Sequence, residues 1–198
     1  LSGITQVQVS DWNNNKQQEF SVFSPEEKQI GVTEYKNGAR LAFPELLPLA
    51  GKPVAFVVGR FGKDEHVAAA VLVDKDGKRA LELHRAGKKA DTITLSDEFR
   101  SSPSRMFFHD IDQDGFNDLV FLTPYEKIQV IRYAENSNHE EIDLFPPGGA
   151  VSKPIYGIAD LNGDSKPELL LPQKNFVRAV VLEQKKGTKS WNFRVSDQ

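Results

Sequence analysis

Short apolar runs alternate with polar loops along the whole chain, which is the pattern of strands joined by turns. The stretch KIQVIRY at 127–133 alternates apolar and polar positions, as a half-buried strand does. DLVFL at 118–122 and ELLL at 168–171 are nearly continuous apolar runs, as strands buried on both faces are. No segment keeps an i, i+3, i+4, i+7 apolar stripe over three turns, so we expect little helix.

The apolar runs predict four short strands in each quarter of the chain. In the first quarter they are Thr5–Val9, Glu19–Phe23, Gln29–Glu34 and Arg40–Phe43. In the second they are Val54–Val58, Val67–Val73, Ala80–His84 and Thr92–Leu95. In the third they are Arg105–His109, Asp118–Leu122, Lys127–Tyr133 and Glu140–Phe145. In the fourth they are Ile155–Ala159, Glu168–Leu171, Val177–Glu183 and Ser190–Val195.

The four quarters are copies of one unit of about 50 residues. HDIDQDGFNDLVFL at 109–122 is repeated by IADLNGDSKPELLL at 158–171, with Asp160 placed 50 residues after Asp110. Steps of 50 and 49 back along the chain reach Arg60 and Asp11, again between two apolar runs. Four-stranded repeats of this length are the signature of β-propeller blades. We therefore predict an all-β propeller or partial propeller, one segment over 1–198 with antiparallel blades at about 1–50, 51–100, 101–150 and 151–198.

Acidic and amide side chains recur at alternate positions of the loop between the first two strands of a unit. Numbered from the first aspartate, positions 1, 3, 5 and 9 of the third unit are Asp110, Asp112, Asp114 and Asp118. The same positions of the fourth unit are Asp160, Asn162, Asp164 and Glu168. Position 7, which is Phe116 or Lys166, can add its backbone carbonyl. Oxygen ligands alternating along a tight loop suit Ca²⁺, and Mg²⁺, Mn²⁺ or a site left empty at low metal stay open as alternatives.

Two further features shape this interpretation. Gly115 and Gly163 allow the positive φ angles that a loop folded around an ion requires. An EF-hand is excluded, because it needs a glutamate at position 12 followed by a helix. Position 12 is Phe121 or Leu171, and both lie in strand-like apolar runs. The loop is therefore expected to join two strands of one blade.

DIDQDGFNDLVFL and DLNGDSKPELLL closely resemble the FG-GAP (VCBS-type) repeat of integrin alpha-subunit propellers and many secreted bacterial proteins. In that family the D-x-[DN]-x-D-x-x-x-[DE] loop joins the first two strands of a blade and binds Ca²⁺. The resemblance implies two calcium sites, in the third and fourth units. Propellers of the family commonly have seven blades, so four units imply either an incomplete ring or further blades outside this segment.

The first two units depart from the motif. The first has Asp11, Asn13, Asn15 and Glu19 at the ligand positions, which gives only two carboxylates and a weaker candidate site. Because affinity follows ligand charge, we expect the third site to be the tightest, then the fourth, then the first. The second unit has Arg60 and Gly62 at positions 1 and 3, so we expect no calcium there. We expect Arg60 to supply the missing positive charge by pairing with Asp64 or Glu65.

Other candidate groups have simpler explanations. Asp76-Gly77 is expected to be a hairpin turn, and His109 to pack at a strand end. Trp12 and Trp191 suit a sugar-binding surface, but core packing is the better explanation for both. Lys185, Lys186 and Lys189 are expected at a solvated hairpin tip.

Composition excludes several classes of partner and site. The net charge is −3, so no global field favours nucleic acid. The longest apolar run, VAAAVLV at 67–73, is too short to span a bilayer, so no direct membrane insertion is expected. Cysteine is absent, which excludes disulfides and thiolate zinc sites. Leu1 is not an initiator methionine and no signal peptide is visible, so we expect a mature product or an excised segment.

These observations favour a calcium-binding propeller module for recognition or scaffolding in a larger secreted or cell-surface protein. The family resemblance implies an extracellular, periplasmic or cell-surface location. The expected ligand is a protein or carbohydrate on a propeller face, and the rest of a propeller or another subunit is expected to cover the blade edges. The alternative is a propeller-type polysaccharide lyase or hydrolase. No catalytic constellation is visible in the sequence, so an enzyme is the less favoured interpretation.

Overall fold

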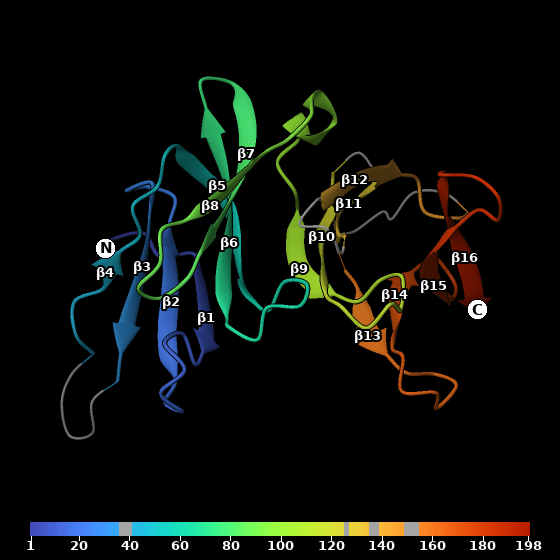
Figure 1. Cartoon of the computed structure of the whole chain (residues 1–198), viewed down its shortest axis with the longest axis horizontal. Coiled ribbons are helices and arrows are strands. Elements are labelled where there is room, and N and C mark those ends of the chain that lie inside the picture. Colours follow the sequence, from blue (N-terminus) through green and yellow to red (C-terminus); the bar gives the residue numbers. More distant parts are fainter. Residues whose placement is uncertain (36–40, 125–126, 135–138, 149–154) are drawn as a thin grey trace. The chain divides into compact units, whose positions relative to one another are not determined.

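The computed structural model describes residues 1–35, 41–124, 127–134, 139–148 and 155–198. The strands form four antiparallel sheets, and within each sheet the four strands lie in chain order (Figure 1). The chain divides into an N-terminal unit, Leu1–Arg100, and a C-terminal unit, Ser101–Gln198, with two sheets in each. We call the sheets the first to fourth blades. The all-β class and the four four-stranded blades are as predicted.

The N-terminal unit contains the first two blades. The first blade consists of β1 (Gln6–Ser10), β2 (Glu19–Ser24), β3 (Gln29–Glu34) and β4 (Glu45–Leu46). The second consists of β5 (Lys52–Gly59), β6 (Ala68–Lys75), β7 (Lys78–His84) and β8 (Asp91–Thr94). A short 3-10 helix, η1 (Asp97–Arg100), follows β8.

The C-terminal unit contains the third and fourth blades. The third consists of β9 (Arg105–His109), β10 (Asp118–Leu122), β11 (Ile128–Tyr133) and β12 (His139–Leu144). The fourth consists of β13 (Gly157–Ala159), β14 (Glu168–Pro172), β15 (Val177–Gln184) and β16 (Trp191–Asp197). In the described part of the chain, no helix is long and apolar enough to cross a membrane.

One predicted strand, Arg40–Phe43, is wrong. Arg40 lies outside the described residues, and 41–44 form no strand. The fourth strand of the blade instead follows Pro44 and pairs Glu45 with Val32. Pro44 has no N–H to donate to a ladder, and the chain before it is held by a side chain: the Thr33 hydroxyl donates to the Ala42 carbonyl over 2.7 Å. The ladder therefore begins only after the proline.

Each unit has its own apolar core between its two blades. In the N-terminal unit Phe23 and Ile30 of the first blade pack against Phe56 and the β6 residues of the second, and the rings of Phe23 and Phe56 meet edge to face at 5.9 Å. All six residues of the run 68–73 are buried, which explains why β6 reads as a continuous apolar run.

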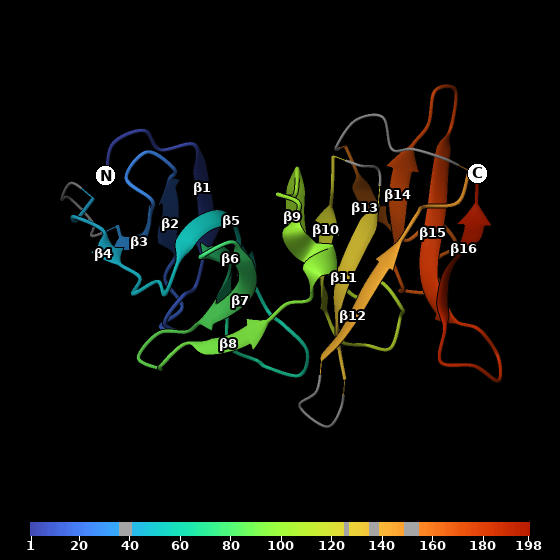
Figure 2. The ribbon, with the colours of Figure 1, turned by 90° about the horizontal axis from the view of Figure 1, so that it is seen from above.

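The core of the C-terminal unit joins the third and fourth blades, which Figure 2 shows as two successive sheets. Val120 and Leu122 of β10 belong to the same buried cluster as Leu169 and Leu171 of β14. The two runs that looked buried on both faces are therefore the central strands of neighbouring blades.

Three expectations about individual groups are confirmed. Trp12 and Trp191 pack against the cores of their units. Asp76 and Gly77 both have positive φ angles, 53° and 80°, which is the type I′ geometry of a two-residue hairpin. The three lysines near residue 187 lie on the exposed hairpin between β15 and β16.

Leu169→Ala tests the core of the C-terminal unit. Leu169 is fully buried, so we expect a loss of about 2–5 kcal/mol in the free energy of unfolding, measured in urea. Leu161→Ala is the matched control, because the Leu161 side chain is half exposed and should lose less than about 1 kcal/mol. Equal losses in the two variants would contradict this assignment of the core.

Candidate metal centre

Three loops join the first and second strands of their blades. Loop 1 covers residues 11–19, loop 3 covers 110–118 and loop 4 covers 160–168. In loop 3, Asp110 directly follows β9, and Asp118 begins β10 in register with His109. The predicted placement, between two strands of one blade rather than before a helix, is confirmed.

Loop 3 is folded by hydrogen bonds from its own backbone to its carboxylates. Asp110 accepts the N–H groups of Asp114 and Gly115 on its two oxygens, each over 2.9 Å. Asp112 Oδ1 accepts the N–H of Asp114 over 3.2 Å, and Asp114 Oδ1 accepts the N–H of Phe116 over 3.0 Å. The alternating acids therefore shape the loop before any ion is considered.

Loops 1 and 4 repeat these four hydrogen bonds position by position. In each loop the position-1 aspartate accepts the N–H groups of positions 5 and 6, over distances of 2.9–3.2 Å. Position 3 accepts the N–H of position 5, and position 5 accepts the N–H of position 7. Loop 1, which has only two carboxylates, therefore has the same backbone geometry as the two loops that match the motif fully.

The strained backbone conformations also occur at the same positions in the three loops. Positions 4 and 6 have positive φ angles in all three loops. The residues are Asn14 and Lys16, Gln113 and Gly115, and Gly163 and Ser165. Gly115 and Gly163 relieve this strain as predicted, but at position 6 in one loop and at position 4 in the other. The hydrogen bonds to the position-1 aspartate hold the non-glycine residues in the left-handed region.

The acid at position 9 is buried in every loop. Asp118 is 0% exposed: Oδ1 accepts the N–H of Tyr133 over 2.8 Å, and Oδ2 has no hydrogen-bond partner among the described residues. Glu19 likewise accepts the N–H of Trp12 on Oε2, while Oε1 is buried without a partner in the same part of the chain. In loop 4 the equivalent Glu168 Oε1 receives a long contact from the Asn162 amide, at 3.4 Å. Two buried carboxylate oxygens thus lack a donor at the position where a bound cation would supply one.

Loop 3 also gathers the most negative charge. Carboxylate oxygens of Asp110, Asp112 and Asp118 lie within 4.8 Å of one another. Burial, reinforced by the charges of Asp112 and Asp114, raises the pKa of Asp118 to about 8 even though the Tyr133 N–H opposes the shift. Burial also raises the pKa of Asp110. In exposed loop 4, by contrast, the N–H of Ser165 lowers the pKa of Asp160.

An arginine side chain that pairs with the acids of loop 3 was not predicted from the sequence. Arg132, near the end of β11, donates through Nε to Asp112 Oδ2 and through Nη2 to Asp114 Oδ2, the latter over 2.8 Å. Its placement follows from the register of the β10–β11 hairpin, since one step beyond the pair Leu119–Ile131 brings Arg132 opposite Asp118. Counting that register on the sequence would have found it.

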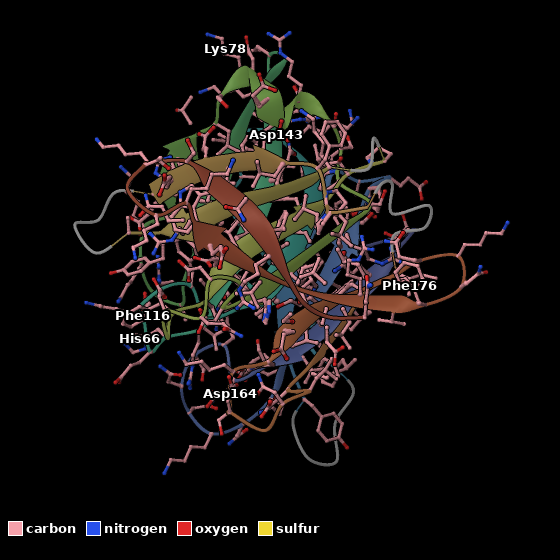
Figure 3. All side chains as sticks on the ribbon, turned by 90° about the vertical axis from the view of Figure 1, so that its right-hand side faces the viewer. His66, Lys78, Phe116, Asp143, Asp164 and Phe176 are labelled. Carbon is pink, nitrogen blue, oxygen red and sulfur yellow. The ribbon has the colours of Figure 1, made fainter. Side chains whose placement is uncertain are left out.

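Loops 3 and 4 contact each other. The Gln113 side-chain amide donates to the Lys166 carbonyl over 3.0 Å, and the Lys166 ammonium donates back to the Gln113 carbonyl over 3.3 Å. Figure 3 labels one residue from each loop, Phe116 and Asp164, which lie on the same side of the C-terminal unit. The carbonyl expected as the position-7 ligand of loop 4 therefore already has one donor from its neighbour.

The donor set of all three loops fits a hard divalent cation. It consists of carboxylate, amide and carbonyl oxygens and has no sulfur ligand. The unpaired buried oxygens of Asp118 and Glu19 are the positions where such an ion would compensate most charge. The expected residues could hold Ca²⁺, with the position-9 acid as the buried ligand.

The second blade has another arrangement, and the pairing expected for Arg60 is wrong. Arg60 is exposed, and Asp64 pairs instead with Arg85 Nε over 2.6 Å. Arg85 also pairs with Asp91 at 2.8 Å. The partner is the residue directly after β7, because the Arg85 side chain is mostly buried beside the loop whereas Arg60 is exposed.

The N-terminal unit also contains a cleft of about 520 Å³ beside loop 1. Its lining includes Trp12, Glu19, Phe43, His84 and Arg85. His84 is buried and meets Glu82 at 2.8 Å. The residues whose pKa values shift to about 4 and about 8, His109 and Asp118, lie in the other unit. The cleft is therefore lined by both polar and apolar side chains, and His84 in its wall is held by a carboxylate behind it.

Comparisons with known proteins agree with the repeat and the fold. Residues 110–171 match the model of the FG-GAP-like repeat. No curated protein shows significant similarity to the chain. Two similar solved structures are crystal structures of BBS1N in complex with ARL6DN, one soaked with mercury and one with lead.

The two structures resemble the chain in fold alone. The mercury structure is 13% identical with a TM-score of 0.58, and the match covers 100% of this chain and 55% of that one. The lead structure is 14% identical with a TM-score of 0.52, covering 91% and 55%. The chain spans about half the length of either structure. The likeness confirms the β-propeller class.

The buried acids predict a specific pH dependence for the metal-free protein. Asp118 holds a proton in the folded state up to about pH 8, whereas an unfolded aspartate loses it near pH 3.9. Stability therefore falls as the pH rises through this window. His109 acts in the opposite sense, because burial lowers its pKa to about 4, so stability rises between about pH 4 and 6.5.

Above about pH 6.5 His109 no longer changes the stability, so of these two residues only Asp118 contributes to its pH dependence. We expect the free energy of unfolding in EDTA to fall by up to about 1.4 kcal/mol per pH unit from about pH 6.5 to 8. Asp118→Asn should remove the slope, because the amide keeps the acceptor for Tyr133 and cannot ionise. Asp76→Asn, in an exposed hairpin turn, is the control. A slope that persists in Asp118→Asn would show that another group titrates.

Proposed function

Since residues 110–171 carry an FG-GAP-like repeat in a propeller-type fold, we propose that the chain is a calcium-binding recognition module. The observation that supports calcium best is the repeated loop geometry. The same four backbone hydrogen bonds recur in loops 1, 3 and 4, and they leave the position-9 acid buried beside the other carboxylates. A divalent cation is the simplest donor for the unpaired oxygens.

Calcium would act as a structural ion. The ligands lie at the junction of the first two strands of a blade, so an ion there links the loop to the central strand through Asp118, Glu168 or Glu19. An unfolded chain has no such arrangement, so binding free energy adds to folding free energy. We expect two principal sites, in loops 3 and 4, and a weaker one in loop 1, which has two carboxylates.

A secreted or cell-surface location is consistent with this role. Sites of this ligand charge suit the calcium concentrations found outside the cytosol, where extracellular modules bind at about 10⁻⁴–10⁻³ M. The absence of cysteine neither requires nor opposes that compartment. The ligand set supports a location with millimolar calcium, and we include such a location in the proposal.

We favour a protein as the binding partner. The similar solved structures are complexes of BBS1N with ARL6DN. Trp191 packs against the core of its unit and its ring is covered by the Arg132 guanidinium, so it is not a flat platform for a sugar, while Trp12 packs against its own core and lines the cleft. A rigid set of loops held by ions would provide a preorganised surface for such a partner.

A thermal melt in EDTA, in millimolar CaCl₂ and in MgCl₂ tests the calcium site. At about 100 times the dissociation constant, one site adds about 2.7 kcal/mol, which corresponds to a rise of roughly 5–10 °C in Tm at this chain length. The rise should be specific to calcium, because Mg²⁺ requires a tighter octahedral site.

Asp164→Asn should remove part of the calcium-dependent rise and leave the metal-free melt almost unchanged, because Asn keeps the acceptor for the Lys166 N–H. Asp76→Asn controls for the loss of one charge elsewhere. Equal melts in EDTA and CaCl₂ for the unmodified chain would refute a structural role for calcium.

A further inference from the structure

Arg132 occupies the side of loop 3 that a cation would use. Its Nε pairs with Asp112 Oδ2, and its Nη2 pairs with Asp114 Oδ2 at 2.8 Å. The Oδ1 atoms of the same carboxylates accept backbone N–H groups of the loop. The guanidinium therefore takes the two oxygens that the fold of the loop leaves available. Its side chain is 18% exposed, so this pairing is only partly screened by water.

The other two acidic loops have no positive residue at this place. Continuing the register of each hairpin to the position-9 acid gives Arg132 in the third blade, Glu34 in the first and Val181 in the fourth. Loop 3 also differs in having four carboxylates, whereas loop 4 has three and loop 1 has two. Loop 3, the acidic loop with the most carboxylates, is therefore also the one with an arginine at this place.

Glu140 provides a further carboxylate close to the Arg132 guanidinium. Glu140 on β12 is directly opposite Arg132 on β11, which places their Cβ atoms about 4.5–5.5 Å apart. Glu140 Oε1 accepts the indole N–H of Trp191 over 2.8 Å. The Arg132 guanidinium also lies over the Trp191 ring, 4.8 Å from its centre. Arg132 therefore pairs with Asp112 and Asp114 and has Glu140 as its cross-strand neighbour, and Trp191 contacts both the arginine and Glu140.

We propose that Arg132 is a built-in competitor for the cation of loop 3. Without metal, its guanidinium neutralises Asp112 and Asp114 and keeps the loop folded. A divalent cation takes over their Oδ2 atoms, and the guanidinium moves to Glu140. The inference rests on the proposed calcium site and deepens it, because it names the residue that sets the affinity of one loop.

The competition changes the expected order of the sites. Charge alone ranked loop 3 above loop 4, because loop 3 has one more carboxylate. A cation entering loop 3 must first displace Arg132, while loop 4 has Val181 at the equivalent place and no such cost. Loop 4 therefore fills at lower calcium than loop 3, and the third blade keeps its loop closed when calcium is scarce.

Calcium titration of a matched pair of variants tests the proposal. Trp12→Phe leaves Trp191 as the single tryptophan, and Asp164→Asn weakens loop 4, so the fluorescence of Trp191 reports on loop 3 through its contact with Arg132. In this background we expect calcium to change Trp191 fluorescence as Arg132 moves. Arg132→Gln should lower the loop-3 dissociation constant about tenfold, measured by calorimetry, and abolish the fluorescence change.

Glu140→Gln should act in the opposite direction. It removes the charge that receives the displaced guanidinium but keeps the acceptor for the Trp191 N–H, so the loop-3 dissociation constant should rise about threefold. This variant leaves Arg132 on the loop, so it decides the question even if Arg132→Gln does not fold without metal. A melt in CaCl₂ checks that each variant is folded.

The outcomes separate this inference from the proposed function. If the unmodified chain binds calcium and Arg132→Gln binds it with equal or lower affinity, Arg132 has only a structural role and the inference is overturned. If the unmodified chain binds no calcium at millimolar concentration, the calcium site and the competition fail together. Opposite shifts in the two variants support the competition.

Discussion

The hydrogen bonds from backbone N–H groups to the first aspartate of each acidic loop are the constraint on which the candidate sites depend. Asp110 and Asp11 each accept two of these bonds and Asp160 accepts three, and they hold two residues of each loop at positive φ angles. Such angles cost free energy for Gln113, Asn14 or Ser165, so the loop keeps them only because the carboxylate compensates. The fold of the loop also determines where the second strand of the blade begins. An acid is therefore needed at position 1 for folding as well as for any ion.

Closing the loop in this way brings carboxylates close enough to repel one another. The third and fourth blades reduce this repulsion in different ways. The turn brings the remaining acids together and buries the one at position 9, where an unpaired charge is expensive. Loop 4 replaces one acid by Asn162, whose amide contacts Asp164 and Glu168. Loop 3 keeps four acids, and it lowers the repulsion through Arg132 and through a pKa of about 8 at Asp118. The amide, the arginine and the bound proton each neutralise oxygens that a calcium ion would bind. The number of carboxylates alone is therefore not a measure of metal affinity.

Much of this architecture could be predicted from local patterns. The 50-residue repeat and the apolar runs gave the blades, because strand periodicity and turn residues are encoded within a few positions. The loop ligands followed from spacing for the same reason. The failures are side-chain contacts that depend on how the strands pair. Arg60 was expected to pair with Asp64, but Arg85 reaches it from another hairpin. Arg132 was missed because its place depends on strand register, and the strand at 40–43 was displaced beyond Pro44 by the hydrogen bond of a side chain.

Neighbouring loops are also linked to each other, which bears on how a propeller of this kind presents a surface. The position-4 amide of loop 3, Gln113, contacts position 7 of loop 4, and the position-4 amide of loop 1, Asn14, contacts His66 at position 7 of the second blade. The same device thus occurs once in each unit. An ion that fixed the Lys166 carbonyl would also restrain Gln113, whose backbone is already held at a positive φ. Order at one loop would then lower the conformational entropy left to be lost at the next, so ion binding would make the loops of a unit rigid together rather than one by one.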